Sequence, residues 1–179
     1  MDSHELQALI KTARRKPLWV ANGDSRKVSI ARAGIERLIP HRVPFLFVDE
    51  ITDISLEQQA IRGTRHVSKD DPVFRGHFPG DPIYPGVLQL EMIGQLGLCL
   101  MHFLISGETE ISDGAPPQNI RALKVHEARF LAPIGPGSDL TIISQAVSWN
   151  DYTGICAGQV LRGDTICSCC LLEVYFVGQ

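Results

Sequence analysis

The sequence carries no excess of positive charge, and this limits the partners that it can bind. Its 17 Lys and Arg are outnumbered by 20 Asp and Glu, and the formal net charge is −3. A protein that binds nucleic acid through bulk electrostatics is normally basic, so we expect no nucleic-acid partner. Hydrophobic residues make up 44 % and charged residues 21 % of the chain, which excludes a mainly disordered or fibrous protein.

Long hydrophobic runs are also missing. A membrane-spanning helix needs ~18 or more largely uninterrupted apolar residues. The longest candidate, residues 86–106, contains two glutamines, a glutamate and a histidine. Polar residues interrupt the first five positions, so no apolar signal peptide opens the chain. We therefore expect no membrane span and a cytoplasmic location.

Recurrent cofactor and metal motifs are absent as well. The chain has no Walker loop, no dinucleotide fingerprint, no Gly-x-Ser-x-Gly elbow and no His-Glu-x-x-His zinc site, so we expect neither a cofactor nor a metal. Its five cysteines are odd in number and irregularly spaced, which favours free thiols in a reducing compartment. On a strand, Cys167 and Cys169 would face one way and Cys170 the other, which favours core packing over a metal cluster.

The chain has 179 residues, which is the length of one domain. Its charge is unevenly placed, because residues 1–42 hold nine Lys and Arg against four Asp and Glu. We expect residues 1–34 to form a basic N-terminal extension and residues 35–179 to form the main domain. Such an extension could meet an anionic partner, or it could be an ordinary solvated surface segment.

Local patterns predict the elements. Residues 5–16 have the spacing of a short amphipathic helix, which Pro17 would end. Apolar residues occur on almost every side of residues 87–106, and a helix that is apolar all round is a buried one. Strand-like runs predict strands at residues 45–48, 59–67, 140–149, 153–162 and 165–177.

These elements predict an α+β protein in which a curved antiparallel sheet wraps around one long central helix. A single sheet must curl around a helix to cover several of its faces. The helix would still need another layer of structure to cover it, which suggests a dimer with continuous sheets.

Two side chains near a shaped loop can exchange protons. His77 lies within residues 76–86, where three Gly and three Pro exclude a helix or a sheet interior. A histidine has an ordinary pKa of ~6.5, which suits proton transfer near neutral pH. Glu91 lies on the apolar helix, so burial should raise its pKa and make it a proton donor. Gln95, one turn further, could orient the Glu91 carboxyl, and His102 continues the same stripe.

The start of the predicted helix offers a group that can bind an anion. Pro85 fits the first helical position, where its missing N–H costs nothing. Gly86 then presents a backbone N–H at the positive end of the helix dipole, which is a suitable oxyanion site. Each feature alone also has an ordinary structural explanation. A loop histidine is often a hydrogen-bonding residue, and a helix glutamate usually lies at the surface.

Three stretches resemble one known family. Residues 76–95, GHFPGDPIYPGVLQLEMIGQ, resemble the signature of the β-hydroxyacyl-acyl-carrier-protein dehydratases with the hotdog fold. Residues 38–49, LIPHRVPFLFVD, resemble the opening of the same family. Residues 128–130 and 136–139 resemble its third strand and the turn that follows. The resemblance spans about residues 35–177, with the motifs in the expected order.

This resemblance implies a hydro-lyase that converts a (3R)-hydroxyacyl-acyl-carrier-protein to the trans-2-enoyl form. It implies that His77 is the catalytic histidine and Glu91 the catalytic carboxylate. The Gly86 N–H would bind the thioester carbonyl, and Gln95 would hold Glu91. The substrate-binding residues expected from the same signature are Gly86, Gln95, Phe78 and Tyr84.

The resemblance also implies partners. The substrate would arrive on an acyl carrier protein, and the enzyme would be a homodimer, or a trimer of such dimers. Each site would combine His77 of one chain with Glu91 of the other. Family members with Glu at this position mostly dehydrate only, whereas the branch that also isomerises usually has Asp. Met92 and Tyr84 depart from the usual pattern, which leaves the acyl chain length and the pathway open.

Two other functions remain open from the sequence. A hotdog thioesterase would use Glu91 to activate water, and a non-catalytic subunit would only bind the carrier. Acyl carrier proteins are acidic, so docking on an acidic body requires local positive charge. The candidate docking residues are Arg75, Arg121, Lys124 and Arg129, and more weakly the basic arm Lys11–Lys16.

Overall fold

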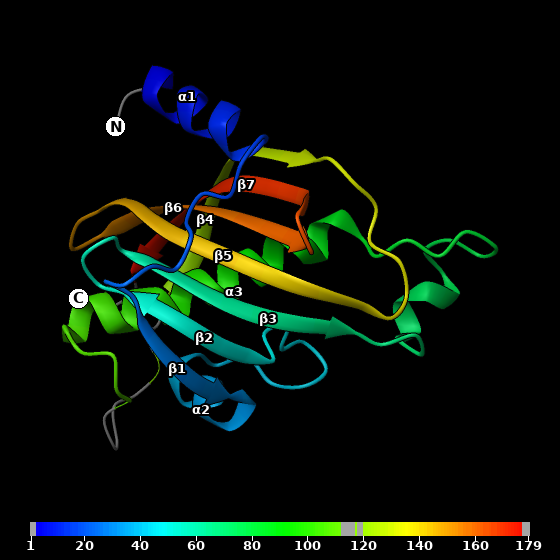
Figure 1. Ribbon diagram of the computed structural model, residues 1–179, viewed down its shortest axis with the longest axis horizontal. Helices are drawn as coiled ribbons and strands as arrows, with labels where there is room; N and C mark the ends of the chain where they lie inside the picture. The colour runs from blue at the N-terminus through cyan, green and yellow to red at the C-terminus, as the bar shows by residue number, and fades with distance from the viewer. Residues whose placement is uncertain (1–2, 112–116, 118–119, 177–179) are drawn as a thin grey trace.

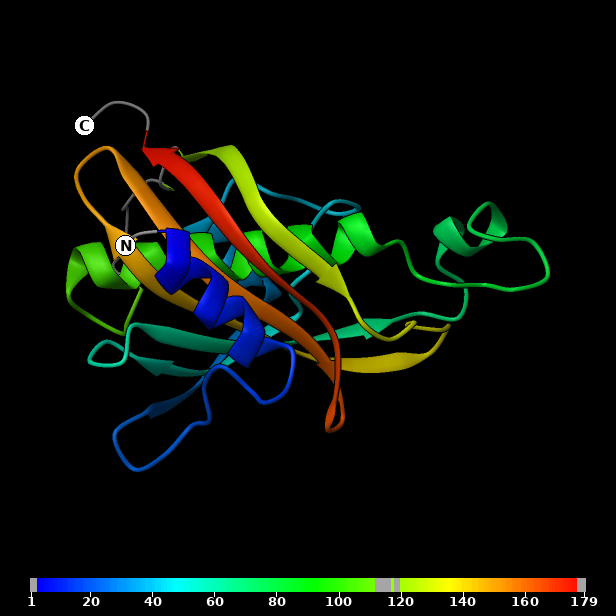
Figure 2. The same ribbon diagram turned by 90° about the horizontal axis from the view of Figure 1, so that it is seen from above.

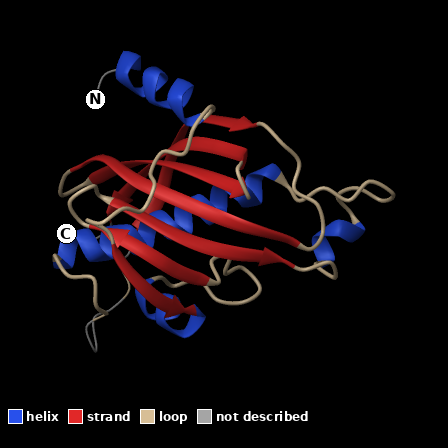
Figure 3. Cartoon of the chain, in the orientation of Figure 1, coloured by secondary structure: helices blue, strands red, loops and turns tan. Residues whose placement is uncertain are grey.

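The computed structural model describes residues 3–111, 117 and 120–176. Its main body is a seven-stranded antiparallel sheet that curls around one long helix, α3 (Gly86–Ser106), as Figure 1 shows. Figure 3 shows the same layering by secondary structure, with α3 enclosed by strands and α1 (Ser3–Ala13) outside them. The predicted α+β architecture is therefore confirmed.

The order of the strands places β1 and β4 at the two edges of the sheet. The full order is β1-β2-β3-β5-β6-β7-β4. The strands are β1 (Arg26–Ala31), β2 (Glu50–Ser55), β3 (Ala60–Val67), β4 (Ile120–Phe130), β5 (Ser138–Trp149), β6 (Thr153–Arg162) and β7 (Thr165–Phe176). The remaining helices are α2 (Arg32–Leu38) and the 3-10 helix η1 (Pro72–Arg75).

Most predicted elements appear within a few residues of their expected bounds. β3, β5, β6 and β7 match predicted strands, although residue 177 of the last prediction lies outside the described residues. The predicted strand at residues 45–48 is wrong, because this segment is irregular backbone. The sequence patterns also did not predict β1 or α2. Pro85 is the N-cap of α3 rather than its first helical residue, so the prediction there was one position off.

The central helix α3 forms the core together with the inner face of the sheet. Met92, Ile93 and Leu96 are fully buried on it. β6 can approach closely because residue 158 is glycine, and a Cβ there would lie 2.0 Å from the Ile93 side chain. By length and hydropathy α3 could cross a membrane, but 61 % of its most apolar window is buried inside the protein. Its apolar character is therefore explained by its place in the core.

The N-terminal segment packs on the outer face of the sheet. Figure 2 shows α1 crossing β6 and β7 on the side opposite to α3. Ile10 and Ala13 of α1 form a small buried cluster with Ala157, Cys169 and Leu171 of the two strands. Helix α1 thus covers apolar surface that would otherwise be exposed, and β1 extends the sheet itself.

All five cysteines are free and buried. Cys167 and Cys170 belong to the main core around α3, whereas Cys169 lies in the cluster under α1. The prediction that Cys167 and Cys169 share a face is therefore wrong, because the register of β7 against β6 shifts between Val160 and Leu161. Core packing is what the structure shows for these thiols. Among the described residues, no group of His, Cys, Asp or Glu is arranged to hold a metal ion.

Candidate active site

His77 is held in one tautomer by the loop before α3. Its backbone N–H donates to the Val73 carbonyl at 3.0 Å, and its own carbonyl accepts from the Ile83 N–H at 3.0 Å. The His77 ring places Nδ1 2.8 Å from the Ile83 carbonyl oxygen. A carbonyl can only accept, so Nδ1 carries the hydrogen and the Nε2 lone pair is left to act as a base. The sequence singled out His77 as a candidate base. The hydrogen bond to Ile83 within the loop determines that Nε2, and not Nδ1, is the nitrogen available to accept a proton.

His77 and Gly86 line the same groove. This groove has a volume of about 450 Å³ and runs along the start of α3 against the end of β4. Gly86 is the first residue of α3, so its N–H has no partner within the helix. A Cβ at this position would lie 2.6–2.9 Å from ring atoms of Phe130, so any larger residue would require the Phe130 ring to move. The base and the proposed oxyanion donor therefore share one wall.

Two further predicted substrate-binding residues lie in different surroundings. Tyr84 lines the groove and is buried, and its hydroxyl has no hydrogen-bond partner among the described residues. Burial raises the pKa of Tyr84 to about 12, so it stays neutral. Phe78 is half exposed and stacks on the His77 ring with centroids 3.9 Å apart. Phe78 borders a second groove, beside η1, that also includes Arg75.

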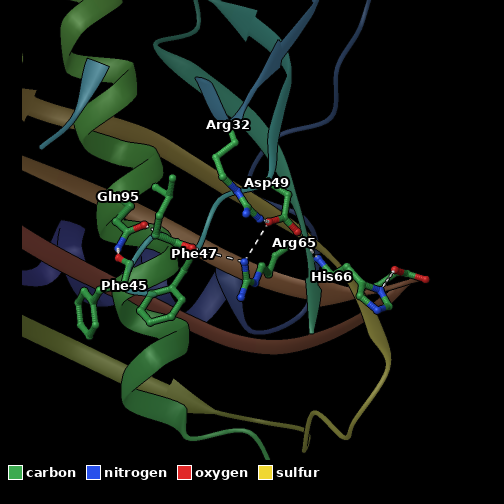
Figure 4. Close-up of polar contacts among 9 residues, drawn as sticks. Arg32, Phe45, Phe47, Asp49, Arg65, His66 and Gln95 are labelled. Carbon is green, nitrogen blue, oxygen red and sulfur yellow. Dashed lines mark hydrogen bonds and ion pairs between the residues drawn. The ribbon is translucent and has the colours of Figure 1, made fainter. Parts of the chain in front are cut away.

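Glu91 is oriented by Gln95, as the one-turn spacing predicted. The Gln95 Nε2 donates to Glu91 Oε1 at 2.9 Å. The same amide donates to the Phe45 carbonyl at 2.9 Å and accepts from the Phe47 N–H at 2.7 Å. Figure 4 shows Gln95 facing these two residues. The segment at residues 45–48 is thus not a strand because a side chain of α3 occupies its backbone groups.

The other end of this segment is fixed by Asp49. Its carboxylate accepts from Arg32 at 2.8 Å, from Arg65 at 2.9 Å and from the His66 N–H at 2.7 Å, as Figure 4 shows. Burial acts to raise the pKa of Asp49, but these donors outweigh it and hold the pKa below its ordinary value. Gln95 and Asp49 together pin both ends of residues 45–49 beside the catalytic helix.

His41 is a site residue that the sequence analysis missed. Its Nε2 lies 3.4 Å from Glu91 Oε1, and its buried Nδ1 has no partner among the described residues. Contact with His41 holds the pKa of Glu91 below its ordinary value, with Gln95 adding to the effect and partial burial opposing it. The expected rise in the Glu91 pKa is therefore wrong. The available signal was the place of His41 within the 38–49 motif, but nothing local ties that motif to α3.

One chain does not bring all predicted residues together. The described residues that line the groove around His77 and Gly86 do not include Glu91. Glu91 instead faces His41 and Gln95. His102 is buried two turns beyond Gln95, and burial lowers its pKa. Within one chain, His77 and Gly86 thus lie together in the groove, and Glu91 lies with His41 and Gln95.

Fold and site together define a class. The protein is an α+β protein in which a curved sheet wraps around one apolar helix, with a histidine in the loop before that helix and an amide-oriented glutamate on it. Residues 39–167 match the FabA-like domain family, so the chain belongs to this family, that of the β-hydroxyacyl-acyl-carrier-protein dehydratases.

Individual relatives agree with this assignment. The chain is 32 % identical over 150 residues to the 3-hydroxyacyl-(acyl-carrier-protein) dehydratase FabZ of Aeromonas salmonicida (strain A449), an alignment that covers 80 % of this chain and 92 % of that one. It is 39 % identical over 106 residues to the FabZ of a Nitratiruptor species, covering 59 % of this chain and 70 % of that one.

A solved structure confirms the predicted hotdog fold. A chain of the dehydratase heterocomplex ApeI:P from Xenorhabdus doucetiae superposes with a TM-score of 0.62. The match covers 86 % of this chain and 94 % of that chain at 19 % sequence identity. At this level of identity the similarity establishes the shared fold.

Proposed function

We propose that the protein dehydrates a (3R)-hydroxyacyl thioester, carried on an acyl carrier protein, to the trans-2-enoyl thioester. The observation that carries this proposal is the His77 ring, whose Nδ1 is bonded to the Ile83 carbonyl so that Nε2 is left as a base beside the Gly86 N–H. A base and an oxyanion donor in one groove are what abstraction of a proton next to a thioester carbonyl requires.

The geometry supports a two-part mechanism. The Gly86 N–H donates to the thioester oxygen and stabilises its developing negative charge while His77 Nε2 removes the C2 proton. The C3–O bond then breaks, and the hydroxyl leaves as water after it receives a proton from the His41–Glu91 pair. After the reaction His77 carries one additional proton and the His41–Glu91 pair carries one proton fewer. Proton exchange with solvent then restores the resting state of both.

The donor proton is shared by a pair of residues. His41 holds the pKa of Glu91 below its ordinary value. We assign the proton to the His41–Glu91 pair, whose Nε2 and Oε1 lie 3.4 Å apart.

Loss of His41 should therefore change the pH dependence of turnover. His41→Ala removes the contact that holds the pKa of Glu91 down, so the carboxyl keeps its proton to higher pH. Because Glu91 must be protonated to donate to the leaving hydroxyl, we expect the alkaline limb of the pH–kcat profile to move to higher pH.

A matched control is His66→Ala, because His66 also faces a carboxylate, that of Asp139 at 2.7 Å, but on an exposed surface away from the site. Its profile should match that of the wild type. An unchanged alkaline limb in His41→Ala would show that the two residues do not share the proton.

A homodimer would complete the site. The edge strand β4 is 11 residues long and exposes Leu123, Val125 and Phe130. A long edge strand that exposes apolar side chains is a surface that proteins cover, most simply with a second copy. We propose that two β4 strands meet, so that each groove around His77 receives Glu91 from the other chain. A trimer of such dimers is compatible with this contact.

The buried free thiols support a reducing, cytoplasmic setting for this enzyme. A thioesterase and a non-catalytic carrier-binding subunit are the other two functions considered from the sequence. They are not favoured, because the named relatives are dehydratases and both acid–base residues are present.

One assay separates the three functions. The purified protein is incubated with a 3-hydroxyacyl thioester while enoyl thioester and free thiol are followed together. We expect the enoyl product without thiol. Release of thiol with the hydroxyl retained would identify a thioesterase, and the absence of both products would identify a binding subunit.

A further inference from the structure

A second groove, separate from that around His77, lies between α1 and the end of β4. It has a volume of about 630 Å³. One wall is formed by the end of α1 and the turn that follows it, with the exposed residues Lys11, Arg14 and Arg15. The facing wall includes Arg129 of β4 and Asp164 of the turn between β6 and β7. The tertiary fold thus brings Arg129 to a group of cations that lies more than 100 residues earlier in the sequence.

The positive charges outnumber the negative ones in this groove. Glu127 and Asp164 are its two carboxylates. Glu127 is engaged by Arg129, with Oε1 and Nη2 2.7 Å apart. Lys11, Arg14 and Arg15 therefore face one remaining carboxylate, and the groove presents a net positive surface on a chain whose net charge is −3. Such a local reversal of sign attracts an anionic partner.

The backbone that carries these cations is held against the sheet by one buried side chain. The Gln159 side chain on β6 is fully buried. Its Nε2 donates to the carbonyls of Ala13 and Lys16, and its Oε1 accepts from the Leu18 N–H at 2.7 Å. This amide uses all its groups to clamp the end of α1 to the sheet. The backbone around the end of α1 is therefore fixed on the sheet, so less conformational entropy is lost when a partner binds the cations that it carries.

The basic groove adjoins the catalytic groove. Leu131 lines both of them. Consecutive strand residues point to opposite faces, and this alternation divides the end of β4 between the two grooves. Phe130 packs over Gly86 at the start of α3, whereas Arg129 lines the basic groove. A partner bound in the basic groove would sit next to the end of β4, where a flexible arm could reach the base.

We propose that this groove, formed by α1 and the end of β4, docks the acidic protein surface of the acyl carrier. This proposal rests on the proposed dehydratase function and assigns a role to the N-terminal segment. Lys11, Arg14 and Arg15 lie outside residues 39–167, which match the family model, whereas Arg129 lies within them. Of the docking residues considered from the sequence, the basic arm and Arg129 belong to this surface.

The test is charge reversal at these three cations at and after the end of α1, alone and combined, as Lys11→Glu, Arg14→Glu and Arg15→Glu. All three side chains are exposed, so the fold should tolerate the changes. The triple variant should raise KM for a 3-hydroxyacyl-acyl-carrier-protein about tenfold or more, with kcat unchanged. Its KM for a 3-hydroxyacyl-N-acetylcysteamine thioester should match the wild type. The rise of wild-type KM with salt should be weaker in the variant.

Lys27→Glu is the matched control, because Lys27 is an exposed cation on β1, at the opposite edge of the sheet. It should leave both KM values unchanged. An equal loss on the carrier-bound and the small substrate would mean that α1 supports the fold, and an unchanged carrier KM would overturn the docking site. A rise in KM for a 3-hydroxyacyl phosphopantetheine thioester as well would place the arm's phosphate, not the carrier's protein surface, in the groove.

Direct binding keeps the test independent of the proposed activity. Fluorescence anisotropy with a labelled holo-acyl-carrier protein should show weaker binding to the triple variant and normal binding to Lys27→Glu. If the wild type dehydrates neither substrate, the proposed function fails, while this measurement still decides the docking site. Weaker binding to RNA or to anionic vesicles, with carrier binding unchanged, would reject the carrier as the occupant.

Discussion

Removing either proton-transfer group is expected to abolish most of the activity. His77→Ala deletes the base, and Glu91→Gln replaces the carboxyl by an amide of the same shape that cannot donate its proton. Each should lower kcat by about 10²–10⁴, the usual contribution of a general acid or base. Stability should change little in Glu91→Gln, because Gln95 can still hydrogen-bond to the new amide oxygen. Steady-state kinetics with a small 3-hydroxyacyl thioester measures the loss.

Two matched variants control for nonspecific effects. His66→Ala and Glu57→Gln remove the same chemical groups from exposed positions outside the site. Both should retain wild-type turnover, and thermal melts should show that all four variants are folded. Wild-type kcat in either His77→Ala or Glu91→Gln would remove that residue from the mechanism.

Mixing the two inactive variants is expected to restore activity. If each site takes His77 from one chain and Glu91 from the other, a mixed dimer has one site with both groups intact and one with both missing. Statistical exchange of equal amounts gives about half mixed dimers, so the mixture should regain about a quarter of wild-type activity. The separation of Glu91 from the groove around His77 in one chain motivates this expectation.

Subunit exchange must be demonstrated for this result to be interpretable. Native mass spectrometry of differently tagged variants shows whether mixed dimers form. Mixed dimers that remain inactive would place both groups in a site within one chain. A sample that is monomeric throughout, yet active as the wild type, would exclude the shared site by itself.

Several parts of the molecule follow from local sequence alone. The largely apolar composition of residues 86–106, with apolar side chains on almost every side, predicts a buried helix. The alternation at residues 140–149 and the turn before residue 165 predict strands for the same local reason. His77, Glu91 and Gln95 could be singled out because their roles depend on a Gly/Pro loop and on one-turn helix spacing, which are short-range features.

Tertiary contacts decided the rest. The apolar run at residues 45–48 has the composition of a strand, but the Gln95 amide takes up its backbone hydrogen bonds. The pKa of Glu91 follows from His41, 50 residues earlier in the chain, and not from the apolar neighbours on its own helix. Burial could be inferred from the local pattern, whereas the identity of the opposing partner could not.

The basic groove shows the same division. The sequence showed an excess of Lys and Arg near the N-terminus, but not that α1 would lie on the outer face of the sheet. Gln159 holds it there, and Arg129 then faces it across the groove. Local chemistry determines which residues can form a helix, a strand or a proton donor. Which of them meet depends on how distant segments pack around one core, because burying apolar surface is non-directional and leaves the partners to the whole fold.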